Sequence, residues 1–263
     1  MLEYITWDVS REIIKIGSFE IRWYGLLFGL GFVFAYLVLQ RIFKKEGVKP
    51  ELLDKLTVYC ALATVIGARL GHVLFYEPAY YFNHPGEILK VWEGGLASHG
   101  AAVAIILAAI IFARVYKLNV WWIFDMIGIV IPLVAAFVRT GNLINSEIYG
   151  KPTDVPWAFI FVKTDITPRH PTQIYEAVSY IILFIVLLVV YYKKGKTLKP
   201  GFIAGLTLSS LFTLRFIIEF FKDIQVPFEN SLPIDMGQIL SIPIVFTGIA
   251  FMIIALRKKK SQS

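Results

Sequence analysis

QIYEAVSYIILFIVLLVVYY, residues 173–192, is a predominantly apolar stretch of twenty residues, long enough to cross a hydrocarbon core of roughly 30 Å as a helix. Lipid offers no hydrogen-bond partner to a bare backbone, so a segment of this kind must be helical inside a membrane. Comparable stretches recur along the chain and give candidate spans at about 19–40, 52–76, 96–115, 119–138, 173–192, 201–221 and 235–256. The sequence therefore predicts an all-α integral membrane protein with seven transmembrane helices, forming a single transmembrane domain over residues 1–263.

The composition agrees with this fold class. Of the 263 residues, 57% are hydrophobic and 17% are charged, whereas soluble domains carry about 25% charged residues. A net charge of +7 would suggest a nucleic-acid partner in a soluble protein. Here Lys and Arg cluster at the ends of apolar blocks as topology signals, so we expect no nucleic-acid partner. The single cysteine, Cys60, excludes an internal disulfide and a multi-cysteine metal site, and we expect neither metal nor cofactor.

The orientation follows from the basic residues of the short loops. Lys and Arg concentrate in alternate connections, within residues 41–49, 114–117, 193–199 and 257–260. The positive-inside rule places these connections in the cytoplasm with the carboxyl terminus, and the amino terminus outside. No basic segment or small-residue cleavage site accompanies the first apolar block, so we expect it to remain as a span.

Two outer segments have recognisable patterns. Residues 139–172 form the longest connection, rich in Gly, Pro and aromatic residues, and are predicted to be an extracytoplasmic loop. Residues 13–23 alternate around Gly17-Ser18 as in a small hairpin lying on the membrane.

Several ionisable side chains lie within the spans, where each costs about 2.5–3.5 kcal/mol on insertion scales. Arg69 lies near the outer end of the second span, and His99 lies in the first turn of the third. Arg139 closes the fourth span, while Arg215 and Glu219 are one helical turn apart near the outer end of the sixth. These positions come from four spans yet share one depth. Arginines and a histidine at headgroup depth predict a pocket for the phosphate of an outer-leaflet lipid, because the planar guanidinium binds phosphate oxygens in pairs.

Each of these residues also has an ordinary structural explanation. Arg215 with Glu219 would serve as a structural ion pair, and Arg69 would snorkel towards the headgroups. His99 would hydrogen-bond a neighbouring helix, and Arg139 would anchor a helix end. Asp125, the main intramembrane acid at the opposite end, is attributed to helix-end solvation or packing. The shared depth of the outer group favours the joint interpretation over these separate ones.

The stretch after the fourth span reads RTGNLINSEIYG, residues 139–150. It closely resembles the signature of prolipoprotein diacylglyceryl transferases, an Arg-x-Gly-Asn-Phe-Ile-Asn-x-Glu run that ends in Gly a few residues on. Further stretches resemble the family in the same order over nearly the whole chain, namely residues 22–25 (RWYG), 67–71 (GARLG), 95–100 (GLASHG), 169–176 (RHPTQIYE), 215–220 (RFIIEF) and 236–238 (MGQ). Each piece is short, but the ordered set is specific.

The resemblance implies an activity and a location. Members of the family move the diacylglyceryl group of phosphatidylglycerol onto the lipobox cysteine of a preprolipoprotein signal peptide. This reaction forms a thioether, releases glycerol phosphate and is the first step of bacterial lipoprotein maturation. The implied location is the bacterial cytoplasmic (inner) membrane, multi-pass, with the active site towards the extracytoplasmic side and membrane lipid as a partner.

The resemblance also implies site residues. His99, Arg139 and Arg215 are the expected catalytic core. The expected substrate-binding residues are Tyr24, Arg69, Asn142, Glu147, Gly150 and Glu219. The chain departs from the family pattern at three places: Leu143 replaces the signature Phe, Val138 replaces its leading Gly, and Leu211 stands where the family often has Tyr. No phenolic role is carried over to that last position.

The transfer reaction requires specific roles of these residues. The thiol must become a thiolate, since its free pKa is near 8.5, and the leaving phosphate needs its growing charge stabilised. We hypothesise that His99 accepts the thiol proton while Arg139 and Arg215 bind the phosphate. Glu147 and Glu219 would hold the guanidinium groups, while Asn142 and Tyr24 would bind the glycerol headgroup or order the loop.

Three other classes of function are compared with this one. A transporter for an anionic solute or lipid would place its binding groups near the midplane and often shows inverted repeats, unlike the outer group found here. An intramembrane serine protease would draw on Ser98 beside His99, but the chain has no Gly-x-Ser-x-Gly stretch. A purely structural anchor explains none of the costly arginines.

Overall fold

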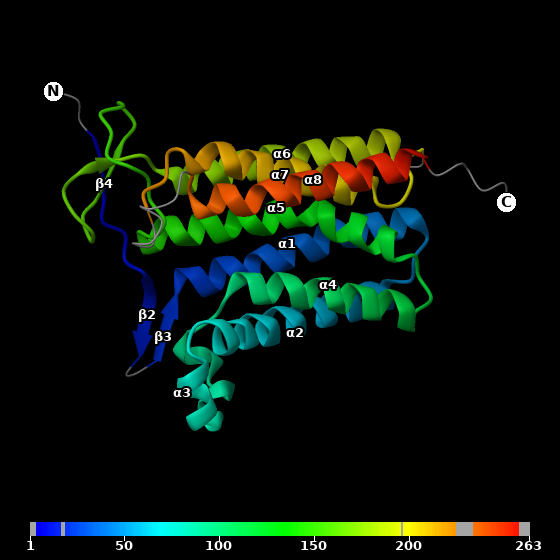
Figure 1. Ribbon diagram of the computed structural model, residues 1–263, viewed down its shortest axis with the longest axis horizontal. Helices are drawn as coiled ribbons and strands as arrows, with labels where there is room; N and C mark the ends of the chain where they lie inside the picture. Colours follow the sequence, from blue (N-terminus) through cyan, green and yellow to red (C-terminus); the bar gives the residue numbers. More distant parts are fainter. Residues whose placement is uncertain (1–3, 17–18, 196, 225–233, 258–263) are drawn as a thin grey trace. The chain divides into compact units, whose positions relative to one another are not determined.

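The computed structural model describes residues 4–16, 19–195, 197–224 and 234–257 (Figure 1). Seven of its helices are long and apolar enough to span a membrane: α1 (Trp23–Glu46), α2 (Pro50–Phe75), α4 (Ser98–Val115), α5 (Val120–Asn145), α6 (Thr172–Lys194), α7 (Phe202–Glu219) and α8 (Met236–Arg257). The prediction of an all-α membrane protein with seven spans is thereby confirmed. The expected turn at Gly17-Ser18 and the basic residues 258–260 lie outside the described residues.

Three helix boundaries differ from the predicted spans by four residues or more: the start of α1, its end at Glu46 rather than residue 40, and the end of α5. Helix α1 begins at Trp23 because Phe19–Arg22 form strand β3, which pairs antiparallel with β2 (Glu12–Ile16). The two strands of the predicted hairpin are paired, so residues 19–22 belong to β3 rather than to the first span. Helix α5 continues to Asn145, so the first half of the signature stretch is helical.

The contacts of the chain divide it into two compact units, residues 1–37 with 125–263 and residues 38–124. In the second unit, α2 packs closely on α4 through glycines. A Cβ atom at Gly67, Gly71 or Gly100 would overlap the facing helix. Small residues allow such close approach between membrane helices. This unit also contains α3 (Pro78–Asn83) and the 3₁₀ turns η1 (Pro85–Leu89) and η2 (Val91–Glu93).

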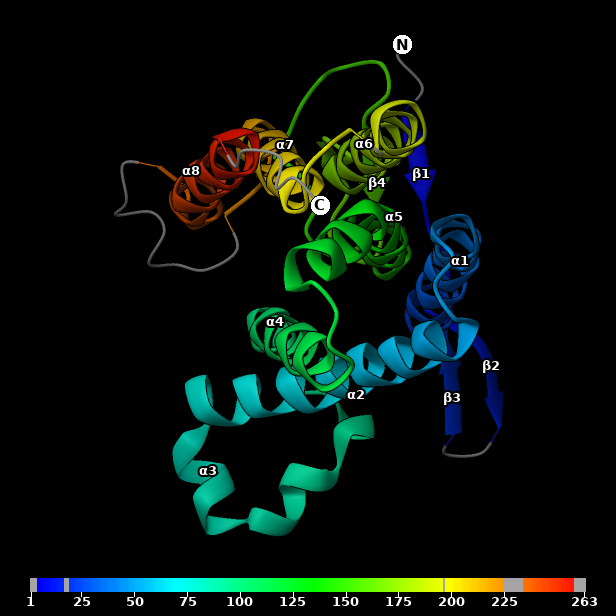
Figure 2. The same ribbon diagram turned by 90° about the vertical axis from the view of Figure 1, so that its right-hand side faces the viewer.

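In the first unit, α7 lies between α6 and α8, as the end-on view of Figure 2 shows. Gly205 of α7 meets Gly248 of α8 so closely that a Cβ on either would overlap the other backbone. The pair again places small residues at a helix–helix contact, where dispersion contacts and close backbone approach replace the hydrophobic effect.

A small sheet supports the signature stretch. Strand β4 (Phe159–Phe161) pairs in parallel with β1 (Ile5–Trp7) and antiparallel with β5 (Pro168–Arg169). Phe159 and Phe161 pack with Leu143 of α5, and the Trp7 indole donates a hydrogen bond to the Leu143 carbonyl at 2.9 Å. The sheet thus fixes the end of α5 where the signature stretch leaves the helix.

Asp125 caps a neighbouring helix. Its Oδ2 accepts a hydrogen bond from the Gly201 amide at 2.8 Å, and its Oδ1 accepts one from the Ala204 amide at 2.7 Å. These amides belong to the amino-terminal end of α7, where the first backbone N–H groups have no partner within the helix. The negative charge also suits the positive end of the helix dipole. The acid attributed to helix-end solvation or packing therefore acts as an N-terminal cap.

We expect the Asp125→Leu variant to unfold at a lower temperature than the wild type, because two buried amides lose their acceptors. The loss of a cap costs about 1–2 kcal/mol. Asp125→Asn retains one carbonyl oxygen and should fall in between. Thermal unfolding of detergent-purified protein measures the order, with exposed Asp154→Asn as the control. An unchanged Tm for Asp125→Leu would contradict the capping role.

Candidate functional site

Glu176 of α6 lies at the centre of the charged groups of the first unit. Its side chain has 0% exposed surface, and its Oε2 lies 2.9 Å from Nε of Arg139 on α5. Its Oε1 lies 3.1 Å from Nζ of Lys222 and accepts a hydrogen bond from the Tyr180 hydroxyl at 3.0 Å. An unpaired buried carboxylate would cost several kcal/mol, and the two cations offset this cost for Glu176.

The same Lys222 extends the network to α7. Its side chain is 3% exposed, and its Nζ lies 3.0 Å from Oε2 of Glu219. Glu219 Oε2 lies 4.0 Å from Nε of Arg215, one helical turn earlier. We call the five residues Arg139, Glu176, Lys222, Glu219 and Arg215 the charge network. Its signs alternate along the chain of contacts, and it joins α5, α6 and the end of α7.

The charge network has an excess of positive charge. Three cations face two carboxylates, which leaves one positive charge when all five groups are ionised. Arg215 has the most exposed side chain of the five, at 34%, and the longest ion-pair distance. The excess charge is therefore most accessible at Arg215. An anion at this end of the network would meet the partly exposed guanidinium of Arg215.

The signature stretch continues the network from Arg139. The Arg139 Nη1 donates to Asn142 Oδ1 at 3.2 Å, and Asn142 Nδ2 donates to Glu147 Oε2 at 3.3 Å. Asn145 Nδ2 donates to Glu147 Oε1 at 3.1 Å. The structure thus brings Arg139, Asn142 and Glu147 together, but Glu147 reaches the guanidinium through an amide rather than directly.

Two glycines of the signature stretch allow close packing. A Cβ at Gly141 would overlap the ring of Tyr24, so this glycine seats Tyr24 of α1 against α5. Gly150 donates its amide to the His170 carbonyl at 2.8 Å and forms an isolated antiparallel bridge with Lys222. A Cβ at Gly150 would overlap main-chain atoms on both sides. Gly150 therefore joins the signature loop to the segment that carries Lys222.

Arg69 and His99 belong to the second unit. The Arg69 guanidinium is buried and donates to the carbonyls of Ile88 at 2.9 Å, Gly94 at 2.7 Å and Glu87. Its Cζ lies 4.9 Å from the centre of the Tyr81 ring. Arg69 thereby orders residues 87–95, and its expected contact with substrate stays a prediction.

His99 is the second residue of α4. Its ring centre lies 5.5 Å from that of Phe75 and 5.8 Å from that of Tyr76. Aromatic contacts from the end of α2 and the residue after it therefore orient the imidazole. Its expected part in catalysis also stays a prediction.

Sequence reasoning did not single out Glu176 and Lys222, although both are central to the network. Glu176 entered only as the last residue of a resembling stretch, yet it is an acid in the second turn of an apolar span. Lys222 follows Glu219 by three residues, a spacing typical of ion pairs on a helix. It also lies on the predicted outer side, which is poor in lysine. Both signals were present in the sequence.

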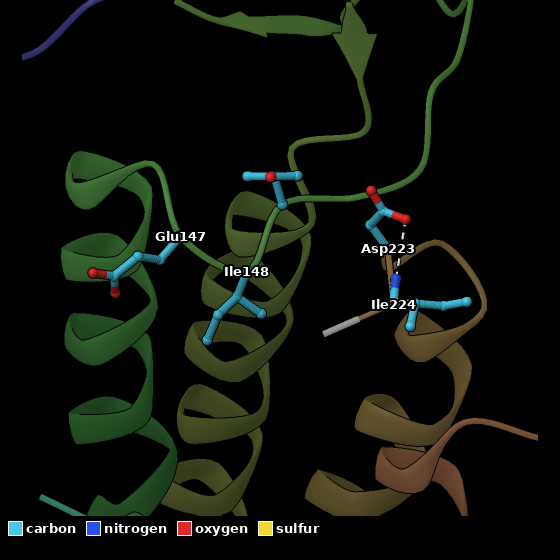
Figure 3. Close-up of a pocket in the computed structure, with 5 residues that line it drawn as sticks. Glu147, Ile148, Asp223 and Ile224 are labelled. Atoms are coloured by element: carbon cyan, nitrogen blue, oxygen red, sulfur yellow. Dashed lines mark hydrogen bonds between the residues drawn. The ribbon is translucent and has the colours of Figure 1, made fainter. Parts of the chain in front are cut away.

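A cavity of about 430 Å³ opens beside the signature loop, lined by Glu147, Ile148, Tyr149, Asp223 and Ile224 (Figure 3). The Glu147 carboxylate is directed towards α5, away from Asp223. Asp223 is itself neutralised, because its Oδ2 lies 2.7 Å from Nη1 of Arg169. No cluster of three His, Cys, Asp or Glu side chains able to hold a metal occurs within the described ranges.

Comparison with known proteins gives full-length similarities. The family model described as prolipoprotein diacylglyceryl transferase matches residues 11–254. A phosphatidylglycerol–prolipoprotein diacylglyceryl transferase of Tolumonas auensis is 44% identical over 254 residues, covering 96% of this chain and 98% of that one. Proteins of the same name from Bacteroides fragilis and Chloroherpeton thalassium are 43% and 44% identical, covering 98% and 94% of this chain and 98% and 92% of theirs.

The charge network predicts non-additive effects on stability. Glu176→Gln leaves Arg139 and Lys222 without their buried counter-ion, and breaking such a pair costs roughly 3–5 kcal/mol. Lys222→Met leaves two carboxylates short of a cation and should also lower the Tm. The double variant Glu176→Gln/Lys222→Met removes both partners and should lose less than the sum of the single variants.

Thermal unfolding in detergent measures this cycle, with the exposed ion pair of Lys15 and Glu20 as the matched control. Glu20→Gln should leave the Tm within experimental error, because exposed pairs contribute little. Strictly additive losses in the buried cycle would refute the coupling.

Proposed function

Because this chain belongs to the prolipoprotein diacylglyceryl transferase family, we propose that the charge network is where it transfers the diacylglyceryl group of phosphatidylglycerol to a prolipoprotein. The chain is a multi-pass membrane transferase, and this reaction is the first step of lipoprotein maturation. The observation that carries the proposal is the alternating chain of contacts from Arg139 through Glu176, Lys222 and Glu219 to Arg215.

The charge balance of the reaction suits this network. The thiol sulfur forms a bond to the glycerol carbon, the carbon–oxygen bond to phosphate breaks, and glycerol phosphate leaves with the electron pair. The phosphodiester carries one negative charge, and the leaving phosphate monoester develops a second. A site with one excess positive charge therefore stabilises the product side of this step more than the ground state. Stabilising developing charge in this way is often the largest contribution to catalysis.

Arg139 and Arg215 have different roles in this proposal. Arg215, the more exposed of the two, binds the phosphate oxygens with the paired donors of its guanidinium. Arg139 is held by Glu176 and Asn142, which fix its position at the end of the signature stretch. Glu219 orients Arg215, and Lys222 prevents Glu219 from neutralising that arginine completely.

The polar side chains of the signature stretch bind the glycerol headgroup. Asn142 and Glu147 present an amide and a carboxylate, which donate to and accept from hydroxyl groups. Tyr24 is seated against Gly141, which follows Arg139 by two residues on α5, and adds a phenolic hydroxyl to this region. Gly150 contributes through its backbone contacts rather than through a side chain.

His99 accepts the proton of the attacking thiol. A cysteine thiol is only a few per cent ionised at pH 7, so a base speeds attack. Support for this assignment comes from the resembling stretch GLASHG, residues 95–100, and from the aromatic contacts that orient the ring.

The acceptor is the lipobox cysteine of a preprolipoprotein signal peptide, and the site opens to the extracytoplasmic side of the bacterial inner membrane. The distribution of Lys and Arg among the connections supports this orientation.

One assay tests the function. Purified protein is incubated with phosphatidylglycerol vesicles and a lipobox peptide, beside a peptide in which the cysteine is replaced by serine. We expect the cysteine peptide to gain the mass of one diacylglyceryl group with an equal amount of glycerol phosphate released, and no gain for the serine peptide. Absence of mass gain by folded protein, or equal modification of the serine peptide, would refute the proposal.

The role of His99 predicts a pH-dependent defect. His99→Gln should reduce the transfer rate at pH 7, and the deficit should shrink above pH ~8.5, where the thiol ionises without help. His84→Gln, which alters an exposed histidine, is the matched control and should keep the wild-type rate. A His99→Gln rate equal to that of the wild type at pH 7 would show that another group accepts the proton.

A further inference from the structure

We propose that the turn Ser146-Glu147-Ile148 is a strained clamp that positions the Glu147 carboxylate for the transfer reaction. Ile148 and Gln173 are the positioning residues of this clamp. The inference rests on the proposed function, because it names residues that act on the same site through Glu147.

The strain lies in the backbone on both sides of Glu147. Ser146 and Ile148 each have φ of 56°, in the left-handed region that L-residues avoid. For a β-branched residue such as Ile148 this conformation is an outlier. Glycine would adopt it without steric cost. Strained residues of this kind persist where the surrounding contacts determine them, and they cluster at functional sites.

The contacts that hold the turn come from two helices. Gln173 Nε2 donates to the Glu147 carbonyl at 2.7 Å, and Thr172 Oγ1 donates to the Ile148 carbonyl at 2.9 Å. Both side chains belong to fully buried residues at the start of α6. From the other side, the Glu147 amide donates to the Asn142 carbonyl of α5 at 2.9 Å. The main chain of Glu147 is therefore fixed at its amide and at its carbonyl.

The fixed main chain of Glu147 determines the direction of its exposed side chain. Glu147 is exposed, and its two oxygens accept from Asn142 and Asn145, which are neutral amides. Its carboxylate is held by these two amides on the α5 side of the cavity in Figure 3, while Ile148 lines the cavity wall. A carboxylate held in this way accepts hydrogen bonds from hydroxyl groups such as those of a glycerol headgroup.

The same geometry reaches the catalytic arginine. The Asn142 side chain accepts from Arg139 with its oxygen and donates to Glu147 with its nitrogen. If the turn relaxes, Glu147 releases Asn142, and Asn142 no longer holds Arg139 in one orientation. Small displacements of positioning groups have large effects on rate, up to about a hundredfold for 1 Å.

The test separates strain from side-chain chemistry at one position. Ile148→Gly removes the Cβ atom that restricts the backbone, so the turn can sample conformations on both sides of φ = 0°, whereas Ile148→Ala removes most of the side chain but keeps a Cβ atom in the left-handed region. The matched control is Lys117→Gly, since Lys117 has φ of 53° in the connection between α4 and α5. Each variant is assayed for Tm and for kcat/KM with phosphatidylglycerol vesicles and the lipobox peptide.

We expect Ile148→Gly and Lys117→Gly to keep or raise the Tm. Of these two glycine variants, Ile148→Gly alone should lose activity, by about tenfold in kcat/KM per folded molecule, and Ile148→Ala should lose clearly less than Ile148→Gly. Gln173→Leu removes the donor to the Glu147 carbonyl and should lower kcat/KM by a greater factor than its loss of folded protein explains.

Three outcomes would overturn the inference. They are wild-type kcat/KM for Ile148→Gly, an Ile148→Ala defect as large as that of Ile148→Gly, or an activity loss that only follows the folded fraction. In each of these the wild type transfers lipid normally. Failure of the wild type itself would instead refute the proposed function, so the two are distinguishable in one assay.

Discussion

Neutralisation of the buried Glu176 carboxylate is the constraint on which the first unit depends. A charged group with no exposed surface needs cations at contact distance, and these come from Arg139 of α5 and from Lys222 after α7. Dispersion contacts between apolar side chains require no particular pair of atoms and tolerate small shifts along the helix axes. Ion pairs with defined atoms do not, so the charge network sets the register in which α5, α6 and the end of α7 meet. The arginines proposed to bind an anionic lipid are thereby placed by the same contacts that stabilise the helices.

The site combines two kinds of cost. Its charges are desolvated, and the backbone beside Glu147 is held in a conformation that its residues avoid. Both costs are offset by contacts outside the reacting groups: Lys222 and Glu176 for the charges, Thr172 and Gln173 for the turn. The first two residues of α6 and the acid one turn later therefore support both halves of the site. A short segment of one helix carries most of the preorganisation.

Much of the fold was predictable because the membrane imposes simple rules of length and polarity, and the seven spans follow from them. The extension of α5 to Asn145 was not predictable in the same way, because the polar residues of the signature stretch are typical of a loop. The shared position of Arg139, Arg215 and Glu219 near the outer ends of their spans singled them out, and the structure places all three in the charge network. Glu176 entered only through the resembling stretch, although it is an acid in the second turn of the span α6. The left-handed turn at Ser146 and Ile148 has no local signal, because neither residue type favours it and only tertiary contacts select it. The partners of Arg69 are main-chain carbonyls, which no sequence pattern reveals.

The parallel pairing of β1 with β4 has a consequence for biosynthesis. Ile5–Trp7 is synthesised about 150 residues before its partner Phe159–Phe161, with four membrane helices in between. Contacts between residues so distant in sequence form late, because the intervening chain must first be in place. During translation β1 therefore stays unpaired until α1, α2, α4 and α5 have been inserted into the membrane. The indole of Trp7 can meet the end of α5 only after that point, so the sheet cannot support the signature stretch until more than half of the chain has been synthesised.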